Sequence, residues 1–133
     1  AIIFEQLKKR QDEGDLTLIY GARTEDDLLY RDELNLLSEQ HKNFSYIPTL
    51  SNPSEQWQGH SGYVQQVLLP YLSQKVKFLS TEFYLCGPEA MMSEVEQIIT
   101  VRVLQHFYGQ VKVTLIKNTT LLYSKVNIVK ISN

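Results

Sequence analysis

The stretch "EFYLCGPEAMM" (residues 82–92) decides the kind of fold that this chain adopts. A strand-like apolar pattern runs into Cys86, the turn formers Gly87 and Pro88 follow, and a helix opens directly behind them. Pro88 suits the first helical turn because its ring presets the backbone angle and it needs no amide donor there. A strand that leads into a helix through so short a turn is typical of a parallel sheet whose strands alternate with helices.

The same alternation recurs toward the N-terminus. "LTLIY" (16–20) and "FSYIPTL" (44–50) are apolar runs of strand length that end at turn-forming or polar residues. Pro48 predicts a less central place for the second run, because proline cannot donate a ladder hydrogen bond. The expected helices cover residues 1–13, 24–40 (with Thr24 as N-cap), 63–72 and 88–99. This order predicts an α/β fold with a doubly wound parallel sheet, a class that binds ligands at the carboxyl ends of its strands.

The composition is that of an ordinary globular domain. Of 133 residues, 43% are hydrophobic and 21% are charged, which suffices for one domain with its own core. The single cysteine excludes an internal disulfide framework and a multi-cysteine metal site, and the histidines lack zinc-binding spacing. No apolar run reaches the roughly 20 residues of a membrane helix, and no basic face of the nucleic-acid-binding kind is present. We therefore expect a cytoplasmic protein with no direct membrane span and no nucleic-acid partner.

Four segments, in order, resemble the pyridine-nucleotide domain of the ferredoxin–NADP reductase superfamily. They are "LIYGARTEDDLLYRDEL" (18–34), "NFSYIPTLSNP" (43–53), "WQGHSGYV" (57–64) and "FYLCGPEAMMSEV" (83–95). In pattern they are most similar to the reductase components of bacterial oxygenases and to the flavoprotein subunit of the sodium-pumping NADH:quinone reductase. The resemblance implies a partial pyridine-nucleotide-binding domain over residues 1–99.

The resemblance also implies a reaction and its partners. Such a domain passes hydride from NADH, or less readily NADPH, to FAD on a separate flavin-binding domain, and electrons continue to an iron–sulfur or ferredoxin-like acceptor. Peripheral attachment to a membrane complex is then an alternative to a purely cytoplasmic location. The family's first strand and glycine-rich phosphate turn are missing, and residues 1–13 resemble the helix that follows them. We therefore expect no turnover from this chain alone.

The turn after the third expected strand is the expected nicotinamide end of the site. The resemblance implies that Cys86 lies against the nicotinamide and that Gly87 lets the backbone approach the ring. It also implies that the helix behind Pro88 directs its positive end into the site. The alternative is that Cys86 is a small buried side chain at a strand end.

The first expected strand leads to the adenosine end. Gly21 permits close approach, and Arg23 either contacts a phosphate or adenine or lies in solvent. Glu25 and Asp26 stand where a carboxylate would accept hydrogen bonds from the ribose 2′-hydroxyl and repel a 2′-phosphate. Acids in a first helical turn are also favoured by the helix dipole alone, so both interpretations stay open.

The second strand and the following helix contribute further candidates. Ser51 and Asn52 follow the second strand, and NADP-using relatives tend to carry an arginine where Asn52 stands, so NADH is favoured. Tyr63 is either an aromatic contact for the adenosine half or a core residue at a helix start.

The last third of the chain differs in kind from the rest. Residues 1–96 carry all 15 acidic residues beside 8 basic ones, whereas residues 97–133 carry 5 basic residues and no acid. Within it, residues 111–116 and 125–131 alternate apolar and polar side chains as amphipathic strands do. Residues 100–133 are thus an atypical basic tail, either extra strands of the same domain or an end introduced by a frameshift or by cloning. A non-catalytic binding or assembly subunit that uses this tail is the alternative to an enzyme fragment.

Overall fold

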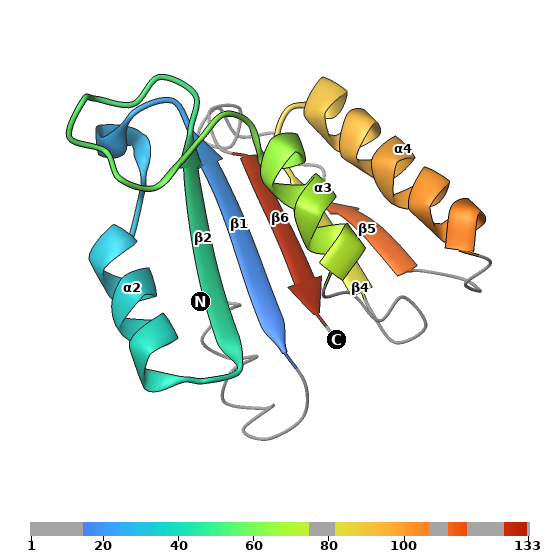
Figure 1. Cartoon of the computed structure of the whole chain (residues 1–133), viewed down its shortest axis with the longest axis horizontal. Coiled ribbons are helices and arrows are strands. Elements are labelled where there is room, and N and C mark those ends of the chain that lie inside the picture. The colour runs from blue at the N-terminus through green and yellow to red at the C-terminus, as the bar shows by residue number, and fades with distance from the viewer. Residues whose placement is uncertain (1–14, 75–81, 107–111, 117–126, 133) are drawn as a thin grey trace.

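The structure, a computed structural model, describes residues 15–74, 82–106, 112–116 and 127–132. The helix expected at residues 1–13 lies outside these ranges. Figure 1 shows one sheet with helices packed against it. In chain order the elements are β1 (Leu16–Ala22), the 3₁₀ helix η1 (Glu25–Asp27), α2 (Arg31–Gln40), β2 (Phe44–Leu50), β3 (His60–Ser61), α3 (Val64–Gln74), β4 (Glu82–Cys86), α4 (Glu89–His106), β5 (Lys112–Ile116) and β6 (Asn127–Ser132).

The sheet confirms the expected α/β class, with one strand reversed. The strand order is β3-β2-β1-β6-β4-β5, and the pairs β1–β2, β2–β3 and β4–β5 are parallel. β6 lies between β1 and β4 and is antiparallel to both, so its arrow in Figure 1 points opposite to the others. An alternating pattern predicts a strand but not its direction, and either direction satisfies the ladder groups of the two neighbours. The sheet is therefore mixed at its centre.

Each face of the sheet has its own apolar core, which makes the sheet doubly wound. β1 is buried along its whole length, and its successive side chains enter opposite cores, as expected for a central strand. One core lies under α3 and α4 and contains Ile19, Val64, Val67, Leu68, Leu72, Phe83, Leu85, Met91, Met92, Val95, Ile99, Val129 and Ile131. The other lies under η1 and α2 and contains Leu16, Leu18, Tyr20, Ala22, Leu28, Leu34, Leu37, Phe44 and Leu50.

The single helix expected at residues 24–40 is wrong, because the chain breaks in its middle. Asp27 Oδ2 accepts hydrogen bonds from the Thr24 hydroxyl (2.9 Å) and the Thr24 amide (3.2 Å), which closes a separate three-residue turn. Leu28 then turns into the core, and Tyr30 adopts φ 56° before α2 begins at Arg31. Because η1 has only three residues, a long helix dipole does not account for its acidic side chains.

The remaining helices run further than expected. α3 continues through Pro70 to Gln74, and α4 extends past Ile99 to His106. Pro48 lies in β2, whose outer neighbour is the two-residue strand β3, so the expected position away from the sheet centre is confirmed. Among the described residues, no helix combines the length and the apolar character needed to cross a bilayer.

Candidate functional site

Three of the predicted turns meet at one edge of the sheet. Gly21 lies at the carboxyl end of β1, Ser51 directly follows β2, and Gly87 directly follows β4. β1 and β2 are parallel, and β1 and β4 are both antiparallel to β6, so all three strands end at the same edge. The expected placement of these three positions is found, while their roles toward a ligand stay predictions.

The turn after β1 and the segment after β2 run side by side at this edge. The Ser51 amide donates to the Ala22 carbonyl at 3.0 Å, and the Asn52 amide donates to the Arg23 carbonyl at 2.8 Å. The Arg23, Ser51 and Asn52 side chains are exposed, so the polar groups predicted for the adenosine end are brought together. We call residues 51–62 the adenosine loop, after that prediction.

The three acidic side chains of η1 make different contacts. Glu25 accepts hydrogen bonds from the Ser54 amide at 3.0 and 3.3 Å and from the Ser54 hydroxyl. The hydrogen bonds from Ser54 lower the pKa of Glu25, so this carboxylate is ionised at neutral pH. Asp27 caps Thr24, whereas Asp26 is exposed and has no hydrogen-bond partner within the described part of the chain.

Sequence reasoning did not find the role of Ser54. It lies 29 residues from Glu25, in a stretch whose composition marks only a loop. No local pattern signals that contact, because the two residues meet only through the pairing of β1 with β2.

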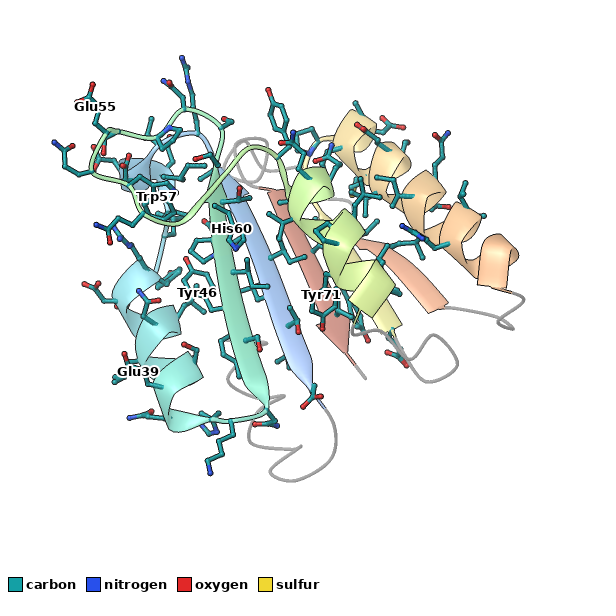
Figure 2. The ribbon with its side chains drawn as sticks, viewed as in Figure 1. Glu39, Tyr46, Glu55, Trp57, His60 and Tyr71 are labelled. Carbon is teal, nitrogen blue, oxygen red and sulfur yellow. The ribbon has the colours of Figure 1, made fainter. Side chains whose placement is uncertain are left out.

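The adenosine loop is also held at its base by Trp57. The Trp57 indole nitrogen donates to the His60 carbonyl at 2.8 Å, and both residues are labelled in Figure 2. The Arg31 guanidinium lies 5.2 Å from the centroid of the Trp57 ring. Gly59 lies directly against this ring, and a Cβ added at its position would lie 2.5 Å from the Trp57 ring, too close for a side chain to fit without a shift of the ring. These contacts make Trp57 a packing residue of the loop.

Tyr63 follows the loop at the start of α3. The Gly62 amide donates to the Leu50 carbonyl at 2.7 Å, and the Gly62 carbonyl accepts from the Thr49 hydroxyl at 2.9 Å, which returns the chain to the end of β2. Tyr63 is 60% exposed, so it is not the core residue that one interpretation of the sequence expected. Its contact with the adenosine half stays a prediction.

The Cys-Gly-Pro turn lies on the β4 side of the edge. Cys86 is only 4% exposed, and burial raises the pKa of its thiol, so the thiol is protonated at neutral pH. Gly87 has φ 154°, a conformation that favours glycine. The Met92 amide donates to the Pro88 carbonyl at 3.0 Å in the first turn of α4. Cys86 is therefore buried at the strand end, as the alternative interpretation of this residue expected, and its contact with a nicotinamide stays a prediction.

β6 enters the sheet between these two halves of the edge. Asn127 pairs with Gly21, and Ile128 pairs with Cys86. Exposed polar groups therefore lie near the ends of β1 and β2, and a glycine turn follows β4, with β6 between them. None of the described residues forms a glycine-rich phosphate turn between them.

Comparison with known proteins agrees with this arrangement. The family described as "Oxidoreductase NAD-binding domain" matches residues 2–97. The chain is 33% identical over 100 residues to a subunit of the Na(+)-translocating NADH-quinone reductase of Serratia proteamaculans, covering 73% of this chain and 25% of that protein. It is 33% identical over 111 residues to the anthranilate 1,2-dioxygenase electron transfer component of Acinetobacter baylyi, covering 81% of this chain and 31% of that protein.

A solved structure shows the same fold. The CS-b5R domains of human Ncb5or in the NAD+ form superpose with a TM-score of 0.66 at 18% identity, covering 86% of this chain and 33% of that one. The chain spans about a quarter to a third of the length of the two curated relatives. It belongs to the oxidoreductase NAD-binding domain family, as its ferredoxin–NADP reductase-like motifs predicted.

Proposed function

We propose that this chain binds NADH as the nucleotide-binding part of a flavoprotein reductase and presents its nicotinamide to a flavin on another domain. The observation that carries the proposal is the family match over residues 2–97 together with the meeting of its three motif turns at one sheet edge. The names of two relatives, an NADH-quinone reductase subunit and an electron transfer component, support it.

The β1–β2 side of the edge is proposed to hold the adenosine half. Arg23 supplies a cation for a phosphate, and Ser51 and Asn52 supply neutral hydrogen-bonding groups. Asp26 is an exposed carboxylate that suits a ribose hydroxyl and opposes a 2′-phosphate. Asn52 offers no cation to a 2′-phosphate, which also favours NADH over NADPH. The exposed Tyr63 ring can stack on the base of the nucleotide.

The β4 side of the edge is proposed to hold the nicotinamide. The bound FAD would supply the hydride acceptor, and this chain's residues orient the donor. Gly87 lets the backbone lie close to the ring, the buried Cys86 thiol is a neutral polarizable group next to that glycine, and the helix after Pro88 supplies a positive end. An iron–sulfur or ferredoxin-like protein is the proposed electron acceptor, and the cytoplasm, with peripheral attachment to a membrane complex as the variant, is the proposed location.

A non-catalytic binding or assembly subunit is the second candidate. One observation favours it: β6 lies between β1 and β4, so it separates the two parts of the edge that a dinucleotide would have to cross. A chain of this kind would keep the fold without binding nucleotide.

A titration of the chain separates the two candidates. Trp57 is the only tryptophan and lies in the adenosine loop, so its fluorescence reports on that loop directly. We expect NADH and ADP-ribose to change Trp57 emission saturably, with weaker binding of NADPH, and calorimetry to give matching affinities. An unchanged emission together with no heat at millimolar NADH would reject nucleotide binding by this chain and favour the assembly subunit.

A further inference from the structure

Glu25 and Asp26 are neighbours in the sequence but not equivalent in the structure. Both carboxylate oxygens of Glu25 accept a hydrogen bond from the Ser54 amide nitrogen, at 3.0 and 3.3 Å, and one of them also accepts from the Ser54 hydroxyl. A carboxylate binds a vicinal diol through both of its oxygens, and both oxygens of Glu25 are already directed at Ser54. Asp26 carries no such partner within the described part of the chain.

The Glu25–Ser54 contact continues a register that the backbone has begun. Ser51 bonds to Ala22 and Asn52 bonds to Arg23, each through a backbone amide and carbonyl. Two residues further along, the side chain of Glu25 takes over this pairing and binds Ser54. Residues 51–54 are therefore fixed against residues 22–25 at both ends, and Asn52 is held within this segment by its own bond to Arg23.

The rest of the adenosine loop depends on the same anchor. The Trp57 amide donates to the Ser54 carbonyl at 3.1 Å, so Ser54 links the Glu25 contact to the Trp57 packing at the base of the loop. The contact with Glu25 is charge-assisted, because its acceptor is a carboxylate. Loss of the Glu25 side chain would remove the contact that joins Ser54 to the turn after β1 and leave the backbone bonds of Ser51 and Asn52 in place.

We propose that Glu25 is a positioning residue, which binds Ser54 and so sets how Ser51 and Asn52 meet the adenosine half of the nucleotide, and that it does not itself contact the ribose. This inference rests on the proposed function. It changes the role that the sequence predicted for Glu25 and leaves Asp26 as the exposed carboxylate of the same turn.

A double-mutant cycle with NADH and ADP-ribose as the probes tests the assignment. Glu25→Ala removes the acceptor of every Ser54 hydrogen bond and should weaken binding roughly three- to tenfold, whereas Ser54→Ala keeps the backbone amide, removes only the hydroxyl contact and should weaken binding by a smaller factor. The double variant should bind no more weakly than Glu25→Ala alone, because the Ser54 hydroxyl has no carboxylate to bind once Glu25 is removed. Glu25→Gln, which keeps an acceptor for Ser54, should restore part of the affinity.

Glu55 supplies the matched control. It is an exposed acid of the same loop, and Figure 2 shows its side chain pointing away from the loop. Glu55→Ala removes the same charge from the same region, so it should bind both nucleotides as the wild type does. A general effect of net charge would instead weaken binding in Glu55→Ala as much as in Glu25→Ala.

A contrasting result would overturn the proposal. If Glu25 contacts the ribose and does not act through Ser54, Ser54→Ala will bind nucleotide as the wild type does, or the effects of the two substitutions will add in the double variant. A second measurement needs no nucleotide. The backbone amide NMR signals of Ser51 and Asn52 should shift in Glu25→Ala and, in the same direction but less, in Ser54→Ala, and unchanged signals in Glu25→Ala would also reject the positioning role. Shifted signals in a chain that binds neither NADH nor ADP-ribose would leave the contact in place and reject the proposed function instead.

Discussion

The placement of β6 between β1 and β4 can be tested by removing one of its buried side chains. Ile131 is 1% exposed and belongs to the core under α3 and α4. Ile131→Ala removes three carbon atoms, worth about 2.4 kcal/mol at about 0.8 kcal/mol each. The cavity left behind adds to this, so we expect a loss of about 3 kcal/mol in the free energy of unfolding, within the usual range of about 2–5 kcal/mol.

The loss should be visible in a simple unfolding experiment. For a chain of 133 residues, about 3 kcal/mol corresponds to a fall in Tm of roughly 10 °C. Urea unfolding followed by circular dichroism and by Trp57 fluorescence should show a lower midpoint with an unchanged slope. Both probes should report one transition, because Trp57 and Ile131 lie in the same sheet-based domain.

Two matched variants serve as controls for this substitution. Ile99→Ala makes the same change on α4, in the same core and at the same 1% exposure, and should also cost about 3 kcal/mol. Leu36→Ala, at a side chain that is 53% exposed, should cost less than about 0.5 kcal/mol. If Ile99→Ala is costly while Ile131→Ala behaves like Leu36→Ala, β6 does not occupy the centre of the sheet and the reasoning fails.

The remaining predictions concern hydroxyl groups, the thiol and cofactor choice. Tyr71→Phe should cost about 1 kcal/mol in urea unfolding, because it removes the 2.8 Å hydrogen bond to Thr17. Tyr46→Phe should be neutral or stabilising, because the buried Tyr46 hydroxyl has no hydrogen-bond partner among the described residues; a clear loss would contradict this. Burial raises the pKa of Tyr46 to about 12, so ionisation of this phenol costs the folded state nothing below about pH 10 and lowers the free energy of unfolding as the pH rises through about 12. Between these pH values the free energy of unfolding should fall less in Tyr46→Phe than in the wild type. Cys86→Ser in a reductase that carries this chain should slow flavin reduction in stopped flow by roughly tenfold, about 1.4 kcal/mol, while KM for NADH moves less; an unchanged rate would assign Cys86 to packing alone. Asn52→Arg should narrow the preference for NADH over NADPH in kcat/KM by about 1–3 kcal/mol, and a wild type that prefers NADPH would contradict the assignment.

The strands and the site edge were predictable because their signals are local. β2 spans the predicted residues, and β1 and β4 begin or end within two residues of them, since each is a short apolar run bounded by turn formers. Once the strands are parallel, the positions of Gly21, Ser51 and Gly87 at one edge follow from topology alone. The family motifs then supplied the roles that are proposed for them.

The parts that were not predicted depend on contacts between distant residues or on side-chain detail. The break after Asp27 arises because Thr24 and Asp27 close a turn on themselves, and helical apolar spacing continues through that break. The reversal of β6 is invisible in its alternating pattern, and the contact between Glu25 and Ser54 exists only once β1 and β2 are paired. Sequence periodicity encodes burial and not these partners.

The central position of β6 also has a consequence for how the molecule is made. β3, β2 and β1 form one half of the sheet and β4 and β5 form the other. Among the strands that the structure describes, β6 alone joins the two halves by ladder hydrogen bonds. A ribosome adds about 5–20 residues per second, so the inner edges of β1 and β4 stay unpaired for several seconds after these strands have been synthesised. Such open edges are templates for pairing with other chains, and closure over more than a hundred residues is slow. Nascent chains of this protein should therefore depend on chaperones until residues 127–132 emerge.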